Sequence, residues 1–231
     1  MRRLIKVHKT TLVRLFLAAV LFVLCFQWGS REVFSPGNYF HPSLILDAGH
    51  GGEDGGAVSP CGVMESVINL EIVLRMEQIL GLLGECPLMV RCENISIHDP
   101  QAQTLREKKV SDLRNRVEAV NANPGSTLVS IHQNSYPSPK YSGTQVFYSP
   151  TAGSKELAEK LQTSVRTALQ PDNLRQEKQI HDSVYLMNHV SNRAVLVECG
   201  FLTNPEEERL LQQPDYQRKL ALVLATALAS E

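Results

Sequence analysis

The sequence has 231 residues, of which 43% are hydrophobic and 20% are charged, and its formal net charge at pH 7 is −1. Without a short N-terminal segment, the remaining length suits one domain with a sizeable core. A net charge so close to zero gives no sign of the basic surface that binds nucleic acid, so we expect no nucleic-acid partner.

The N-terminal 29 residues are typical of a membrane-targeting segment. Arg and Lys recur between positions 2 and 14, and the uncharged run Leu15–Trp28 follows them. A basic region before an apolar run indicates export, and no small-residue cleavage site comes after it. We therefore expect an uncleaved signal anchor at 1–29, a linker at 30–43 and a catalytic domain at 44–231 outside the cytoplasm. The alternative is a cleaved signal peptide and a secreted protein.

The five cysteines form no CxxC pair and no regular spacing. Cys86 and Cys92 flank a predicted strand and could pair only if the backbone brought them together. We expect the cysteines to be mostly free and structural.

Strands and helices alternate along the rest of the chain. Leu44–Leu46 is a short buried strand, and Val67–Leu83 has apolar residues at helical spacing, which places Glu65 at or just before a helix start. This alternation predicts a single α/β domain with a twisted, mainly parallel (mixed) sheet flanked by helices. The other expected elements are strands at Leu88–Cys92, Thr127–Ile131, Thr144–Tyr148 and Ala194–Val197, and helices starting at Ser111 or Asp112, Ser154, Pro205 (capped by Asn204) and Tyr216.

A glycine-rich loop follows the first strand and carries His50, in the stretch LILDAGHGGEDGGA at Leu44–Ala57. Glycines let backbone approach a bound group closely. A phosphate-binding loop is disfavoured because the stretch has neither GK[ST] nor GxGxxG. A plain turn after a strand is the other alternative.

Three predicted strands are each followed by a titratable side chain, and these are His50, His132 and Glu198. Ligands of parallel sheets bind outside the carboxyl ends of the strands, so we expect these residues to converge there. Glu65, close to the glycine loop, can join them. Two histidines and one carboxylate make a three-ligand zinc set with an open position, and a further carboxylate can act as general base. By reach, Glu65 is the better ligand and Glu198 the better base.

Each of these residues also has an ordinary structural interpretation, because most strand-end histidines are not metal ligands. Convergence of three such strand ends by chance is much less expected. Cys61 and Cys199 lie near the predicted site, so a cysteine nucleophile is a further alternative. The basic cluster in the middle of the chain is mostly a solvated helix face, although Arg106 or Arg116 could hold a substrate carboxylate.

Several blocks, in order, resemble the zinc-dependent N-acetylmuramoyl-L-alanine amidases of the type 3 family: DAGHGGEDGGA, RVEAVN, LVSIHQN, SGTQVFY and LVECGFLTNPEE. The resemblance covers Leu44–Ser230 and is strongest to the sporulation-type amidases of endospore formers. It implies one Zn²⁺ per chain held by His50, Glu65 and His132, with Glu198 as the catalytic carboxylate. Ala48, Val120 and Cys199 depart from the usual pattern without removing a ligand. Cys199 raises the question of whether it tunes the site or makes it sensitive to oxidation.

The resemblance also implies the substrate, which is peptidoglycan, and the reaction, which is hydrolysis of the amide between N-acetylmuramic acid and L-alanine. Muramic δ-lactam formation in the spore cortex would be the biological purpose, and a protein activator is a possible partner. Other interpretations are an inactive membrane-anchored wall-binding protein, or a zinc carboxypeptidase or amidohydrolase on the same fold. The sequence says nothing of oligomeric state.

Overall fold

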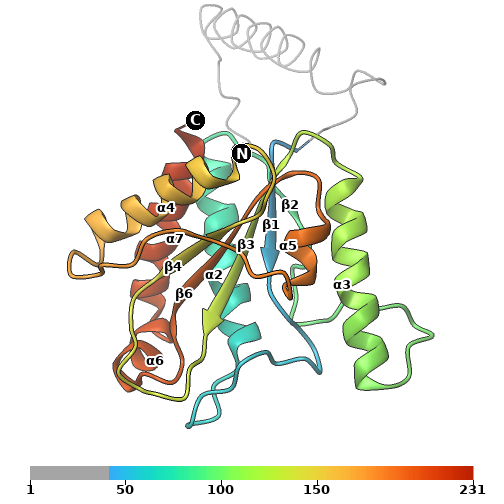
Figure 1. Ribbon diagram of the computed structural model, residues 1–231, viewed down its shortest axis with the longest axis horizontal. Helices are drawn as coiled ribbons and strands as arrows, with labels where there is room; N and C mark the ends of the chain where they lie inside the picture. Colours follow the sequence, from blue (N-terminus) through green and yellow to red (C-terminus); the bar gives the residue numbers. More distant parts are fainter. Residues whose placement is uncertain (1–41, 231) are drawn as a thin grey trace, which may run out of the picture. The chain divides into compact units, whose positions relative to one another are not determined.

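The computed structural model describes residues 42–230 (Figure 1). The expected signal anchor at 1–29 and almost all of the linker at 30–43 lie outside the described residues. Within the described part, no helix is both long enough and apolar enough to cross a membrane.

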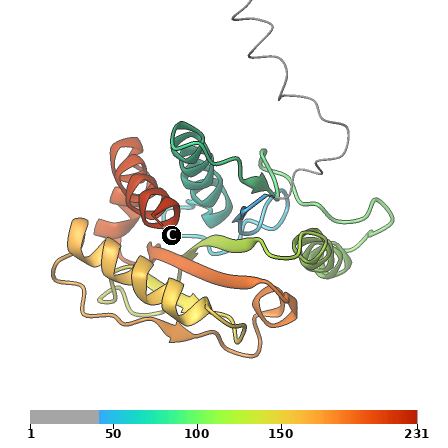
Figure 2. The same cartoon turned by 90° about the horizontal axis from the view of Figure 1, so that it is seen from above.

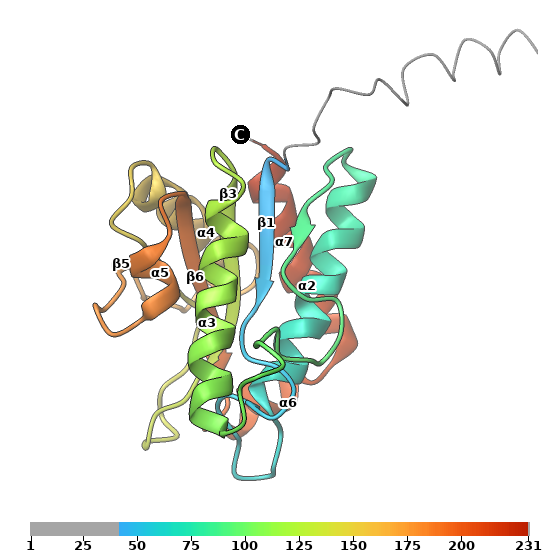
Figure 3. The ribbon, with the colours of Figure 1, turned by 90° about the vertical axis from the view of Figure 1, so that its right-hand side faces the viewer.

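One six-stranded sheet runs through the domain in the order β2-β1-β3-β6-β4-β5 (Figures 1 and 3). Strands β2, β1, β3 and β6 are parallel neighbours, whereas β4 pairs antiparallel with β6 and parallel with β5. The expected mixed, mainly parallel sheet is therefore confirmed. The strands are β1 Leu44–Ala48, β2 Leu88–Met89, β3 Thr127–Asn134, β4 Gln145–Tyr148, β5 Lys178–Gln179 and β6 Arg193–Phe201.

Helices cover both faces of this sheet. Helices α2, α4 and α7 pack against one face, which we call the α2 face, and α3 and α5 pack against the other, which we call the α3 face. Figure 2 shows α2 and α7 lying together, away from α3 and α5. The helices are α2 Glu65–Leu82, α3 Leu105–Asn121, α4 Ser154–Ala168, α5 Tyr185–His189, α6 Pro205–Leu211 and α7 Pro214–Ala229.

Alternation along the strands separates two hydrophobic cores. On β1, Leu44 and Leu46 enter the larger core on the α2 face, whereas Ile45 enters the smaller core on the α3 face. Side chains of a strand point to opposite faces in turn, so Asp47 lies on the α3 face with Ile45. By the same rule, Glu198 follows Leu196 onto the α3 face. This face therefore receives Asp47, His132 and Glu198 near the carboxyl ends of β1, β3 and β6.

Helix α3 begins earlier than the sequence pattern suggested. Thr104, not Ser111 or Asp112, caps it, because the Thr104 hydroxyl accepts from the Glu107 amide while the Glu107 carboxylate accepts from the Thr104 amide. This reciprocal pair is a capping box. Ser111 and Asp112 are instead buried inside the helix.

Several other boundaries also differ. Strands β3 and β6 run on past Ile131 and Val197, so His132 and Glu198 lie inside strands and not after them. Strand β2 is shorter than expected, and α5 was not predicted at all. The Asn204 cap is confirmed, since its side chain accepts from the amides of Glu206 and Glu207. The four described cysteines are free.

Candidate active site

The glycine loop after β1 holds His50 by backbone contacts. His50 has φ +60°, a left-handed conformation that few residues other than glycine adopt. The Gly49 amide donates to the Ile131 carbonyl at 3.0 Å, which ties the loop to β3. Arg91, which is 3% exposed, donates to the carbonyls of Ala48 and Gly49. The loop is therefore a fixed platform, and Arg91 is a support that no sequence signal revealed.

Glu65, the first residue of α2, points back toward this loop. Its Oε2 accepts from the Ala57 amide at 2.7 Å, and its Oε1 accepts from the Gln133 amide at 3.1 Å. Burial by itself would raise the pKa of Glu65, but the hydrogen bond with His132 and the nearby imidazoles outweigh it and lower the pKa to about 2. The side chain is thus a fixed carboxylate at any pH near neutral.

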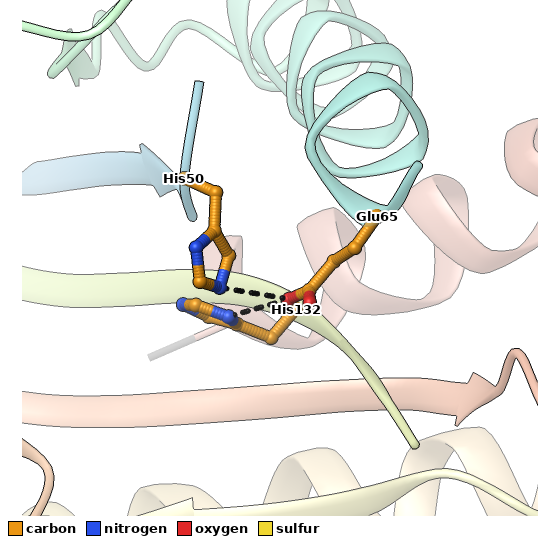
Figure 4. A group of neighbouring side chains, drawn as sticks. All are labelled: His50, Glu65 and His132. Atoms are coloured by element: carbon orange, nitrogen blue, oxygen red, sulfur yellow. Dashed lines mark hydrogen bonds and ion pairs between the residues drawn. The ribbon is translucent and has the colours of Figure 1, made fainter. Parts of the chain in front are cut away.

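His132 completes a compact group with these two residues (Figure 4). Its Nδ1 lies 2.8 Å from Glu65 Oε1, and His50 Nε2 lies 3.4 Å from the same oxygen. One ligand atom from each of the three residues lies within 4.8 Å of the others. The structure thus brings together His50, Glu65 and His132 from a loop, a helix start and a strand.

Glu198 lies beside this group on the neighbouring strand. Its Cα is the register partner of the His132 Cα where β6 pairs with β3. Its Oε2 is buried and has no hydrogen-bond partner among the described residues. Burial raises the pKa of Glu198 to about 7. The charge of His132 opposes this shift, and the charge of Glu65 adds to it. Such a group can both accept and return a proton near neutral pH.

The chemistry of the three converging side chains determines which metal ion they suit. Two imidazoles and one carboxylate, all converging, form the three-ligand set of catalytic zinc sites, whereas Mg²⁺ and Ca²⁺ prefer oxygen ligands alone. The buried Glu198 oxygen, without a partner in the part of the chain that the structure describes, is free to bond to a reacting group beside these three side chains. The residues present therefore fit a zinc ion.

Comparison with known proteins decides the family. The model of the N-acetylmuramoyl-L-alanine amidase family matches residues 44–230. The chain belongs to the N-acetylmuramoyl-L-alanine amidases. This confirms the family that the sequence blocks resembled.

Known amidases are similar to this chain over most of its length. The germination-specific N-acetylmuramoyl-L-alanine amidase of Bacillus subtilis is 35% identical over 205 residues, which cover 87% of this chain and 85% of that protein. The CwlD amidase of Clostridioides difficile, solved in complex with the GerS lipoprotein, is 34% identical with a TM-score of 0.77, covering 81% of this chain and 96% of that one. AmiC2 of Nostoc punctiforme is 25% identical with a TM-score of 0.68, covering 83% and 97%.

Asp54 is a residue of the amidase site that the sequence analysis missed, although it lies inside the glycine-rich block. Its Oδ2 lies 2.9 Å from His50 Nδ1, which leaves Nε2 as the nitrogen that faces Glu65. A carboxylate on the far nitrogen fixes the tautomer and orientation of a metal-binding histidine. The hydrogen bond with His50 is the main reason that the pKa of Asp54 lies well below its usual value.

Neither predicted substrate arginine offers a free guanidinium to the cleft that contains Glu198. Arg106 is exposed in the first turn of α3. It does not line the cleft that lies over His50, His132 and Glu198. Arg116 is 2% exposed, forms an ion pair with Asp47, and donates to Asp112 at 2.7 Å. Its Nη2 also donates to the His50 carbonyl at 2.8 Å. Arg116 is thus a buried support of the loop, and its engaged guanidinium does not have the free donors that the predicted substrate contact requires.

A cleft of about 300 Å³ opens over the amidase site on the α3 face. Helix α3 forms one wall with Lys109 and Leu113, and the start of α5 forms the other with Val184 and Tyr185. His50, His132 and Glu198 also line this cleft. Cys199 faces the larger core on the α2 face, and burial raises the pKa of its thiol far above the usual value. Its thiol is therefore unsuited to act as a nucleophile or to react readily with oxidants.

Gly49 leaves the space that the His132 ring fills. A Cβ at position 49 would lie far inside van der Waals distance of that ring. We expect Gly49→Ala to displace His132 and to weaken zinc binding at least about 10-fold, as loss of ligand support does in other metal sites. Competition titration with a zinc chelator measures this. Gly81→Ala is the matched control because nothing lies within 4 Å of its Cβ, and equal zinc affinity in both variants would contradict the prediction.

Proposed function

We propose that this chain is a zinc-dependent amidase that cleaves the bond between N-acetylmuramic acid and L-alanine in peptidoglycan. In this proposal His50, Glu65 and His132 hold one Zn²⁺, and Glu198 is the catalytic base. The convergence of these three side chains beside the unpartnered Glu198 oxygen is the observation that carries the proposal.

The residues of the chain divide the chemistry between them. When bound, zinc supplies Lewis-acid polarisation of the scissile carbonyl and lowers the pKa of water, so that a nucleophile forms near neutral pH. Glu198 takes the proton of the attacking water and then returns it to the leaving nitrogen of L-alanine. Asp54 keeps the His50 ring in one tautomer, and the Ala57 and Gln133 amides keep the Glu65 carboxylate in place.

The spore cortex is the substrate that the relatives favour. One relative is named germination-specific, and another was solved with a lipoprotein. We infer that this amidase cleaves stem peptides from cortex glycan, a step toward muramic δ-lactam, outside the cytoplasm. A lipoprotein partner is part of this proposal, and so is a membrane attachment through residues 1–29.

Product analysis tests the reaction. The purified full-length protein, loaded with zinc, is incubated with peptidoglycan, and mass spectrometry identifies what is released. We expect peptides that begin with L-alanine and glycan with free lactyl groups. Peptides shortened at the C-terminus would indicate a carboxypeptidase, and unchanged peptidoglycan, also in the presence of the lipoprotein partner, would indicate a wall-binding protein without activity.

A further inference from the structure

The cleft over the site has two cationic side chains in its lining, Lys109 and Arg116. Arg116 is 2% exposed and its guanidinium is fully engaged by Asp47, Asp112 and two backbone carbonyls. Lys109 is 53% exposed, and in the described part of the chain its one ion pair is with Asp54 at 3.3 Å. An anion that enters the cleft can therefore reach the charge of Lys109 but not that of Arg116.

The ion pair of Lys109 is of the kind that a ligand can displace. An exposed pair of this length contributes little to stability, since water screens it. Asp54 does not depend on Lys109 either, because its Oδ2 is also held by His50 Nδ1 at 2.9 Å and its Oδ1 accepts from the Gly56 amide at 3.3 Å. Asp54 thus positions the ammonium group at the cleft rim and can release it without losing its own place.

The apolar part of the cleft suits the backbone of an extended peptide. Val184, Tyr185 and Leu186 form an apolar wall opposite α3, and α3 and α5 lie side by side on this face (Figures 1 and 3). In an unamidated stem peptide, the isoglutamate that follows L-alanine carries a free carboxylate. Resting on the proposed function, we propose that Lys109 binds this carboxylate and makes the enzyme selective for stem peptides that are not amidated there.

The neighbouring lysine provides a matched control. Lys108 differs by one position on α3, and its ammonium group pairs with Glu53 at 2.7 Å outside the cleft. Lys108→Met and Lys109→Met therefore remove the same charge from the same helix, one away from the substrate and one beside it. Lys109→Arg keeps the charge and should keep the selectivity.

The experiment compares two forms of one substrate with the zinc-loaded full chain. Soluble peptidoglycan fragments carry either isoglutamate (native) or isoglutamine (amidated) after L-alanine, so that the two substrates differ at that one carboxylate, and kcat/KM for release of L-alanine peptides is measured. We expect Lys109→Met to lose about 10- to 100-fold on the native fragments, the range typical of a hydrogen bond to a charged group, and less than about 3-fold on the amidated ones. Wild-type protein and Lys108→Met should both prefer the native fragments.

Two outcomes would overturn the inference in different ways. If Lys109→Met loses activity equally on both substrates, or on neither, Lys109 does not bind the carboxylate although the amidase reaction stands. If the wild-type protein releases no L-alanine peptides from either substrate, the proposed function fails and this inference falls with it.

Discussion

Glu198→Gln is expected to lower the rate of peptidoglycan hydrolysis by about 10³-fold while the protein still binds one zinc ion per chain. The glutamine amide keeps the size of the side chain but cannot accept the proton of the attacking water. The Glu198 side chain lies beside the three proposed ligands and is not one of them. Hydrolysis is measured by release of L-alanine peptides, and zinc by inductively coupled plasma mass spectrometry.

His50→Ala distinguishes metal binding from proton transfer. It removes a ligand, so we expect it to lose both zinc and activity. Glu206→Gln, at an exposed position of α6, is the matched control for Glu198→Gln. It should change neither the zinc content nor the activity. A fully metal-loaded His50→Ala protein would contradict the ligand assignment, and a Glu198→Gln protein with ordinary activity would contradict the assignment of the base.

Arg116→Met is expected to destabilise the fold by about 3–5 kcal/mol, the usual cost of breaking a buried ion pair from one side. Asp47, 1% exposed, would keep its charge in the core, and among the described residues its remaining hydrogen-bond donor would be the Ser130 hydroxyl, 2.6 Å away. The loop carbonyl of His50 would also lose its donor. Chemical denaturation of the full chain measures the loss. Arg114→Met, exposed on the same helix, should change the free energy of unfolding by less than about 0.5 kcal/mol.

The pH dependence of this difference identifies its origin. Burial alone would raise the pKa of Asp47, but Arg116 and the Ser130 hydroxyl outweigh burial and hold it below its ordinary value. A carboxylate with a lowered pKa stabilises the fold above pH about 4, and this contribution is lost as the pH falls through the folded-state pKa. The gap between wild type and Arg116→Met should therefore narrow in acid. A gap that stays constant from neutral pH to acid would show that Asp47 is not the partner responsible.

The sequence predicted the layout of the domain because buried strands and amphipathic helices leave local patterns. It also predicted that His50 and His132 would meet, because each comes at or after the end of an apolar run that forms a strand, and the two strands are parallel neighbours. Strand ends were less predictable, because pairing with a neighbour extends β3 and β6 into residues that are polar. Helix α5 has five residues, which is too short for a period to emerge.

The contacts around the site were the hardest part to predict. Arg116 lies among other cations in a segment that resembles a solvated helix face, and its partner Asp47 is 69 positions away in the chain. Nothing local distinguishes it from Arg114. Arg91 is similar, because its bonds are to backbone carbonyls and backbone carries no sequence signal. By contrast, the capping box of α3 has a local sequence signal, because Thr104 and Glu107 stand at the Thr-x-x-Glu spacing.

The strand order has a consequence for how the enzyme is made. All three presumed zinc ligands lie in the first 132 residues, whereas Glu198 arrives on β6, which enters between β3 and β4 in the middle of the sheet. A growing chain therefore carries its whole ligand set long before it can form either the complete sheet or the base. A chain that ends before β6 therefore lacks Glu198, and the site as proposed is complete only when this last strand has been inserted into the sheet.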